Sequence, residues 1–521
     1  MSQPVIATPA THPDVLDDRA LLGHPRGLGL LFVVEMWERF SYYGMRAFLV
    51  LYLVHALQWT DKRAAGLYGI YTSAVYLTPL LGGYLADRFI GTRRSVVLGS
   101  AIIALGHFCL AVPSMATFYA GLGLIIAGTG FFKPNAATMV GQIYRQSDPR
   151  RDSGFTIYYM GVNAGAFLGP IVCGLLAEAV GWHLGFAAAG VGMVAGLVTY
   201  LVWRDRYLPG IGVRAEGGPG HSERAGSRAD TLMVARATGG AVLGLVVAWL
   251  VAGLAAYPLL LGAAIGAVLA ITLLGTEGDE RRRVLAIFLA AVFVVFFWTA
   301  YEQAGSSMNL FADRHTDLVV LGRKWPASWF QSFNPILILL LAPAFAGVWA
   351  ALSRRGREPS TALKMVFGLA LLGVGFLFLV EGGRRADTGV LVSPLCLSLA
   401  YLFHTLGELC LSPVGLSYVS RMAPARYASL LMGAWYLANT IANLLAGALA
   451  GLTPTPGQAH VAQAAGGLAG WLERQSATNG GFFSIFVVIG FVGAALMLVF
   501  VPLLGRLTAS VDGKERAART G

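Results

Sequence analysis

The sequence is poor in charged residues, which make up 12% of its 521 positions, whereas hydrophobic residues make up 56%. Soluble domains carry about 25% charged residues, so this composition excludes an ordinary soluble protein and predicts a chain that crosses a membrane many times. Cysteine is also scarce, and no pair shows the spacing of a disulfide framework or a metal site. The four cysteines fall inside predicted apolar helices: Cys109, Cys173, Cys396 and Cys410.

The nine histidines are scattered without ligand spacing, and no nucleophile stands beside a base. We therefore expect no metal, no catalytic residue and no enzymatic activity. The net charge of +11 does not indicate nucleic-acid binding, because the basic residues lie in short clusters between apolar runs. Such clusters favour orientation of a membrane protein by its positive loops.

Counting apolar runs predicts fourteen transmembrane helices in a six, two, six arrangement. The predicted domains are a cytoplasmic tail 1–26, a six-helix bundle 27–203, linkers 204–283 with an extra helix pair at 231–274, a second six-helix bundle 284–505, and a tail 506–521. The predicted helices are 27–57, 65–87, 95–112, 117–141, 153–180, 184–203, 231–254, 258–274, 284–309, 328–353, 361–380, 390–420, 427–452 and 482–505.

The distribution of Lys and Arg predicts the orientation. With both termini in the cytoplasm, 27 of the 38 basic residues lie on the cytoplasmic side and 8 lie outside. The other three fall inside helices: Arg39, Arg46 and Lys133.

The first predicted helix contains the stretch EMWERFSYYGMR, from Glu35 to Arg46, which places several charges in a segment that should lie in lipid. At about 100° per residue, Glu35, Arg39, Tyr42 and Arg46 form one polar stripe on an apolar helix. A charge at the bilayer centre costs about 2.5–3.5 kcal/mol, so these side chains must face a protein-lined cavity and pair with other groups.

Helix rise alone predicts the partners. Glu35, Glu38 and Arg39 lie about 12–18 Å above the cytoplasmic end of the first helix, and Lys133 lies at about 12 Å in the fourth. The fifth helix brings Tyr158, Tyr159 and Asn163 to about 9–16 Å. We therefore expect one buried network at this level.

A second level lies nearer the outside. Arg46 and Glu302 both lie about 28 Å above the cytoplasmic ends of their helices. We expect them to pair across the two halves as a gate. Glu408 lies about 20 Å up in the second half. The cavity would then be basic on one wall and acidic on the other, which suits a zwitterion. Taken one at a time, these residues also have a structural interpretation. A single Glu or Arg could be part of a structural ion pair, and a single aromatic residue could serve only in helix packing.

Two six-helix halves with a long cytoplasmic connection are the plan of the major facilitators. The loop GGYLADRFIGTRR, residues 82–94, resembles the facilitator pattern G-x-x-x-D-R-x-G-R-R with one residue inserted. The sequence therefore predicts an all-α integral membrane protein with the major-facilitator fold and an extra two-helix hairpin.

Several motifs resemble the proton-dependent oligopeptide transporter family of the major facilitators. The first helix matches its E-x-x-E-R-F-x-Y-Y-G pattern from Glu35 to Gly44, and FTIYYMGVNAGAF, residues 155–167, resembles its fifth-helix signature. GTGFFKPN, FWTAYEQAGSS and GELCLSPVG are also similar to family segments. The resemblance covers both halves.

The resemblance implies a proton-coupled symporter that imports di- and tripeptides by alternating access, with protons and no other cofactor. It implies proton coupling by Glu35, Glu38, Arg39 and Lys133, and we add Glu302. It implies an outer gate of Arg46 and Glu302. The implied substrate-binding residues are Arg39, Tyr42, Tyr43, Arg46, Tyr76, Lys133, Asn163, Trp298, Glu302, Asn334, Glu408, Trp435 and Asn439.

Several alternatives remain at this point. A relative with the same coupling could carry a peptide-like drug or an organic anion. A facilitator-type proton/drug antiporter is less favoured, because Arg39, Arg46 and Lys133 make the first half basic. A membrane enzyme would need a nucleophile–base or metal constellation, which the scattered histidines do not provide. A sensor or scaffold without transport has no supporting soluble domain in this sequence. We expect a monomer in the inner membrane of a bacterium, with peptide, protons and lipid as its partners.

Overall fold

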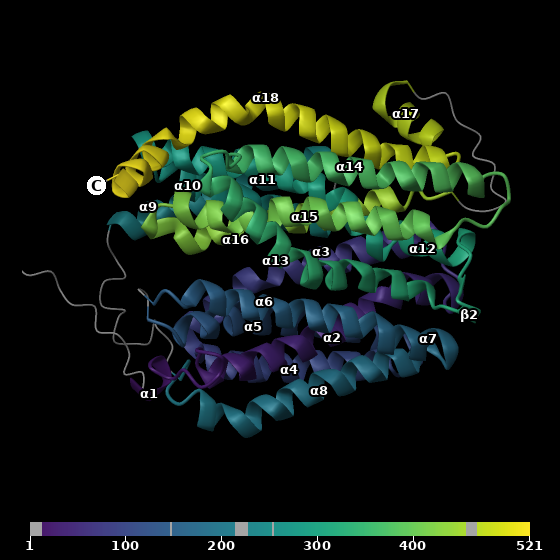
Figure 1. The fold of residues 1–521 in the computed structure, drawn as a ribbon, viewed down its shortest axis with the longest axis horizontal. Coiled ribbons are helices and arrows are strands. Elements are labelled where there is room, and N and C mark those ends of the chain that lie inside the picture. Colours follow the sequence, from purple (N-terminus) through teal and green to yellow (C-terminus); the bar gives the residue numbers. More distant parts are fainter. Residues whose placement is uncertain (1–12, 146–147, 214–227, 253–254, 455–465, 521) are drawn as a thin grey trace, which may run out of the picture. The chain divides into compact units, whose positions relative to one another are not determined.

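The computed structural model describes residues 13–145, 148–213, 228–252, 255–454 and 466–520. Long helices make up most of these residues (Figure 1). Strands are confined, within the described ranges, to one short antiparallel pair, in which β1 (Val319–Val320) pairs with β2 (Arg323–Lys324). The prediction of an all-α chain is confirmed.

The helices of the first part are α1 (Pro13–Leu16), α2 (Arg26–His55), α3 (Asp61–Leu85), α4 (Thr92–Leu110), α5 (Met115–Gln142), α6 (Arg151–Gly169), the π-helical turn η2 (Pro170–Gly174), α7 (Leu175–Ala179) and α8 (Trp182–Tyr207). A π-helical turn η1 (Ala86–Ile90) separates α3 from α4. The extra pair is α9 (Arg228–Ala252) and α10 (Ala256–Leu274).

The last part contains α11 (Gly278–Tyr301), the 3₁₀ turn η4 (Glu302–Gly305), α12 (Ser307–His315), the 3₁₀ turn η5 (Ala327–Ser332), α13 (Phe333–Arg354), α14 (Thr361–Ala386), α15 (Pro394–Met422), the short turn η6 (Ala425–Tyr427), α16 (Ala428–Ala450), α17 (Gly467–Gln475) and α18 (Asn479–Thr520).

Each predicted helix has a counterpart, but some details differ. The predicted helix 153–180 is interrupted by η2, and the predicted helix 328–353 begins with the 3₁₀ turn η5. The predicted helix 284–309 is interrupted at η4, and the predicted helix 482–505 continues to Thr520 in α18. The short helix α17 was not predicted. Positions 1–12 of the predicted N-terminal tail 1–26 lie outside the described residues. The helix α1 begins at Pro13.

Twelve helices of the described chain are long and apolar enough to cross a membrane. The helices α2 and α3 fall outside this set, although they have 30 and 25 residues. In α2 the cause is charge, since every 18-residue stretch of it contains at least three charged residues. The count of fourteen spans therefore stays a prediction, and the helix excluded by its charges is the one that the sequence singled out.

Helix starts follow local capping rules. The Ser360 side chain accepts a hydrogen bond from Leu363 N at the start of α14, and Ser393 accepts one from Leu395 N at the start of α15. Proline occupies the first position of α15, where its missing N–H costs nothing. Asp387 accepts hydrogen bonds from Asn479 N and Gly480 N and so caps α18.

The chain forms two compact units. Unit 1 comprises Met1–Tyr52, Leu77–Ser222 and Trp325–Leu339, and unit 2 comprises Leu53–Tyr76, Glu223–Lys324 and Leu340–Gly521. Each unit therefore contains a stretch that the sequence assigns to the other six-helix half. The predicted domain boundaries remain predictions.

The extra helix pair belongs to unit 2 and is closely packed. Gly244 of α9 faces Gly262 of α10, where an added Cβ would lie 1.9 Å from the Gly262 oxygen, so the backbones are in contact. Tyr257 at the start of α10 places its hydroxyl 2.7 Å from Ser73 Oγ of α3, which in turn donates to Thr440 O of α16. The pair is thus bonded to α3, and Ser73 links this contact to α16 of the same unit.

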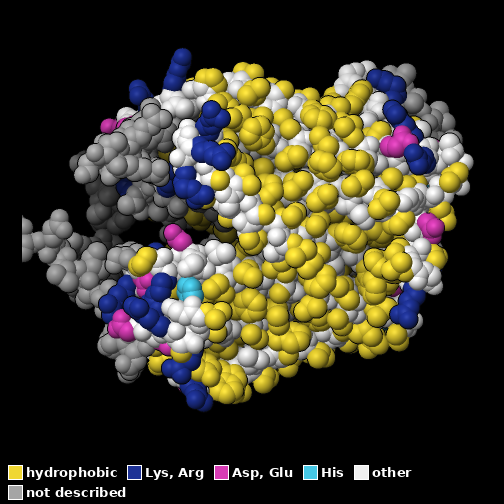
Figure 2. Space-filling model, viewed as in Figure 1, with side chains coloured by type: hydrophobic (Ala, Val, Ile, Leu, Met, Phe, Trp, Pro, Cys, Tyr) yellow, Lys and Arg dark blue, Asp and Glu magenta, His cyan; other side chains and the backbone are white. Residues whose placement is uncertain are grey.

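The exposed surface has the character of a membrane protein. Figure 2 shows that, on the visible face, hydrophobic side chains cover the middle stretches of the helices, whereas Lys and Arg gather near helix ends. Exposed large hydrophobic residues occur on most of the long helices. Apolar surface on this scale is stable only where lipid covers it.

Candidate functional site

Three charged side chains of α2 form a buried network in unit 1. Arg39 Nε lies 2.9 Å from Glu35 Oε1 and 2.7 Å from Glu38 Oε2. All three side chains are at least 95% buried. Lys133 of α5, which is half-buried, interacts electrostatically with Glu38. Two carboxylates and two cations balance, so the cluster can exist in a low-dielectric interior without net charge.

Close packing of α6 on α2 completes this network. A Cβ at Gly165 would lie 2.1 Å from Met36 O, so only glycine allows α6 to approach α2 at the level of Arg39. About two turns earlier on α6, the Tyr158 hydroxyl donates to Glu35 Oε2. Asn163 is 4% exposed, and its side-chain amide donates to Tyr159 O. The predicted match in depth between α2, α5 and α6 is what the structure shows.

Further along α2, two arginines lie over tyrosine rings. The Arg39 guanidinium is 5.8 Å from the Tyr42 ring centroid, and the Arg46 guanidinium is 5.7 Å from that of Tyr43. The two tyrosines are themselves in edge contact at 5.2 Å. Because the faces of aromatic rings attract cations, this stacking stabilises positive charge that is 95% buried at Arg46. Asn334, at the start of α13, is the other predicted site residue in this unit and is half-buried.

Unit 2 contains a second polar group, at the end of α11. The Tyr301 hydroxyl donates to Glu408 Oε2 of α15 at 2.7 Å, and the Trp298 ring lies 4.8 Å from that of Tyr301. Glu302 is 3% exposed and is the first residue of η4. This turn is held by Gln303, whose amide donates to Thr299 O and Ala446 O.

The remaining predicted residues of unit 2 lie on α16 and α3. Trp435 is 4% exposed and packs on Gly415 of α15, where a Cβ would lie 2.3 Å from the indole ring. Asn439 and Tyr76 are half-buried. Glu302 and Glu408 give this unit buried acidic groups, whereas unit 1 carries buried Arg39 and Arg46.

The structure thus groups the predicted residues in two sets. Unit 1 holds Glu35, Glu38, Arg39, Tyr42, Tyr43, Arg46, Lys133, Asn163 and Asn334. Unit 2 holds Tyr76, Trp298, Glu302, Glu408, Trp435 and Asn439. The pairing of Arg46 with Glu302, and every assigned role, remain predictions.

Two tyrosines that bond to buried carboxylates were not among the predicted site residues. Tyr158 had a usable signal, because helix rise placed it at the level of Glu35. Tyr301 had none, because it lies in an aromatic run, FWTAY, that also fits ordinary helix packing.

Sequence reasoning also missed ion pairs between the predicted halves. In unit 2, Arg314 of α12 makes two bonds to Asp61 of α3, at 2.6 and 2.8 Å. His55 Nε2, at the end of α2, lies 2.7 Å from Asp313 Oδ2. The sequence assigns α2 and α3 to the first six-helix half and α12 to the second, so these pairs link the two halves near the C-terminal end of α2.

Unit 1 has an equivalent link. Glu178 of α7 accepts hydrogen bonds from Ala327 N at 3.0 Å, Ser328 N at 3.2 Å and Ser328 Oγ at 2.5 Å, all at the start of η5. Other side chains of η5 donate to backbone oxygens of α6, η2 and α2: Ser332 to Phe167 O, Trp329 to Ile171 O and Gln331 to Ala47 O. Both predicted halves are therefore joined here as well, again near the C-terminal end of α2.

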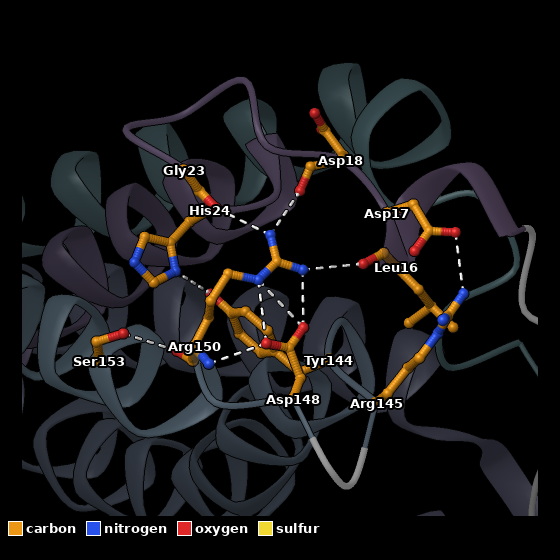
Figure 3. Close-up of polar contacts among 10 residues, drawn as sticks. All are labelled: Leu16, Asp17, Asp18, Gly23, His24, Tyr144, Arg145, Asp148, Arg150 and Ser153. Atoms are coloured by element: carbon orange, nitrogen blue, oxygen red, sulfur yellow. Dashed lines mark hydrogen bonds and ion pairs between the residues drawn. The ribbon is translucent and has the colours of Figure 1, made fainter.

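The other end of α2 is held by residues 13–25, which we call the N-terminal strap (Figure 3). The Arg150 guanidinium donates to three strap carbonyls, those of Leu16, Asp18 and Gly23. It also holds Asp148 at 2.7 Å, and this bond lowers the pKa of Asp148 to about 2. The strap thereby joins the start of α2 to the α5–α6 connection.

Comparison with known proteins identifies the protein family to which this chain belongs. The sequence model of the POT family matches residues 93–209 and 258–466. The uncharacterized transporter YclF of Bacillus subtilis is 38% identical over 83% of this chain and 89% of its own length. A di-/tripeptide transporter of Lactococcus lactis subsp. cremoris is 34% identical over 94% of this chain and 97% of its own.

Solved structures of POT transporters resemble this chain as well. A crystal structure of peptide transporter POT in complex with sulfate is 34% identical, with a TM-score of 0.77 over 94% of this chain and 96% of that one. A POT family transporter in complex with 5-aminolevulinic acid is 29% identical, with the same TM-score over 94% and 99%. These relatives are facilitator-type transporters and not enzymes, which confirms the predicted fold class. The chain belongs to the POT family of multi-pass membrane transporters.

Proposed function

We propose that this protein is a proton-coupled symporter that imports di- and tripeptides by alternating access. It acts as a monomer in the bacterial inner membrane, with both termini in the cytoplasm. The observation that carries the proposal is the buried network of Glu35, Glu38 and Arg39, in which two carboxylates share one guanidinium. The named relatives support the choice of substrate.

The network is suited to respond to a proton. Arg39 Nε is within 3 Å of both carboxylates, so protonation of either glutamate removes one of its ion pairs. Breaking a buried pair costs about 3–5 kcal/mol, and the released cation seeks another anion. A proton can shift a conformational equilibrium only by its differential affinity for the two states, and this network supplies such a difference.

A peptide carries an ammonium and a carboxylate a few bonds apart. Glu408, 6% exposed, is the proposed partner of the ammonium, and Arg39, Arg46 and Lys133 are the proposed partners of the carboxylate. Charge-assisted bonds of this kind are about twice as strong as neutral ones. Asn163, Asn334 and the predicted aromatic residues are proposed as further substrate-binding residues.

Alternating access requires the links between the predicted halves to break. The Asp61–Arg314 pair and the Glu178 bonds to η5 lie near the C-terminal end of α2, which in the proposed orientation faces the outside. In the proposed cycle these links belong to the state that is closed on the outside. Opening would break both links, together with the proposed Arg46–Glu302 gate.

The proposal is tested with purified protein in liposomes. An inward proton gradient should drive accumulation of labelled dialanine, and a protonophore should abolish it. Unlabelled dipeptide should compete, whereas N-acetylated dialanine should compete far less. Accumulation that is unaffected by the protonophore would refute proton coupling. Competition by organic anions without competition by dipeptides would favour the alternative family substrate.

A further inference from the structure

The bond between Tyr301 and Glu408 has a geometry that bears on substrate selection. Tyr301 is the last residue of α11, and Glu408 lies in the middle of α15. The phenol oxygen is 2.7 Å from Oε2, the distance of a strong hydrogen bond to a carboxylate. Tyr301 is outside the set of residues that the sequence assigns to the substrate.

Neighbouring rings fix the direction of the phenol. Phe297 stacks on Tyr301 at 5.6 Å with an angle of 22° between the rings, and Trp298 makes an edge contact at 4.8 Å. On α15, His404 lies one turn before Glu408, and its ring is 6.3 Å from that of Tyr301. His404 is itself 1% exposed and packs at 4.5 Å on Phe376. The hydroxyl is therefore held at a defined place.

A glutamate side chain has three rotatable bonds, and its carboxylate can accept several donors at once. A fixed donor on Oε2 restricts the rotation of the carboxyl group and leaves the direction of its other acceptor sites defined. Pre-organised acceptors bind a cation more tightly, because less side-chain freedom is lost on binding. The gain is larger for an ammonium than for a neutral amide, since the former makes a charge-assisted bond.

We infer that Tyr301 is a positioning residue that orients the Glu408 carboxylate and thereby sets the preference for substrates with a free ammonium group. The inference rests on the proposed function, in which Glu408 receives the peptide amine. The competing explanation is that the bond only ties α11 to α15. That explanation predicts a loss of stability with no change in selectivity.

The experiment measures amine selectivity in liposomes by counterflow. Selectivity is the ratio of the half-inhibitory concentrations of N-acetyl-dialanine and dialanine. Tyr301→Phe keeps the ring and removes the hydroxyl, and we expect this ratio to fall about tenfold, which is the loss expected for a hydrogen bond to a charged group. Tyr257→Phe is the matched control, because it removes a hydroxyl with a 2.7 Å contact to Ser73 in the same unit. The control should keep the ratio of the unchanged protein.

Two further variants separate the possible failures. Phe297→Leu removes the ring that stacks on Tyr301 while keeping the Tyr301 hydroxyl. It should give a selectivity ratio between those of the unchanged protein and Tyr301→Phe. This variant therefore tests the inference if Tyr301→Phe does not fold. An unchanged ratio in the folded variant would overturn the inference. Glu408→Gln tests the proposed amine site itself: if it leaves the ratio unchanged, the amine site is wrong whatever Tyr301 does. If it abolishes selectivity while Tyr301→Phe has no effect, only the role of Tyr301 is wrong.

Discussion

Replacing Asp61 with Asn should destabilise the state that is closed at the end of α2. The substitution removes one charge from a pair with two short bonds, in which the side chains of Asp61 and Arg314 are 5% and 17% exposed. Breaking a fully buried pair costs about 3–5 kcal/mol, and partial solvation of Arg314 reduces this to about 2–3 kcal/mol. That difference changes the equilibrium between closed and open states about 30- to 150-fold.

The assay is the labelling rate of a single cysteine by a membrane-impermeant maleimide added outside. The four native cysteines are replaced, and a cysteine is placed at Tyr76, a predicted cavity position. Asp61→Asn should raise the rate by at least about 30-fold, unless labelling saturates. Asp205→Asn is the control, since its pair with Arg93 involves a carboxylate that is 76% exposed. An unchanged rate in Asp61→Asn, or an equal rise in the control, would refute the reasoning.

Three other predictions follow from particular contacts. Asp313→His should create a zinc site with His55, so that Zn²⁺ inhibits transport reversibly, and His55→Ala in the same background should abolish the inhibition. Arg150→Ala should lower the melting temperature; because its Asp148 partner has a depressed pKa, the difference should persist above pH 4 and shrink toward pH 2. Exchanging Arg46 and Glu302 should restore part of the transport that either reversal loses, and no recovery would argue against the gate.

The sequence predicted the parts of the fold that depend on one helix at a time. Apolar runs gave the helices, and a rise of about 1.5 Å per residue gave the depth of each charge. This was enough to predict that Glu35, Arg39 and Lys133 lie at one level. The network within α2 could also be predicted, because residues four apart on a helix face the same side.

Contacts between segments that are far apart in the chain could not be predicted from the sequence. Nothing local in the sequence indicates that Asp61 meets Arg314, or that Glu178 caps η5, because these bonds depend on how helices far apart in the chain pack. The break at η4 was missed although polar residues interrupt the apolar pattern there, because the prediction extended the helix to 309; the turn is stabilised by the bonds of Gln303. Tyr301 was missed because a tyrosine among aromatic residues is usually packing.

The most direct test of the central claim compares two transport modes in the same liposomes. Glu35→Gln and Glu38→Gln each remove one titratable partner of Arg39. We predict that both variants lose uptake of dialanine driven by a proton gradient but keep at least part of counterflow exchange, which needs no net proton movement. Full gradient-driven uptake in both variants would contradict the account, because the buried network would then be structural and the proton would have to act elsewhere.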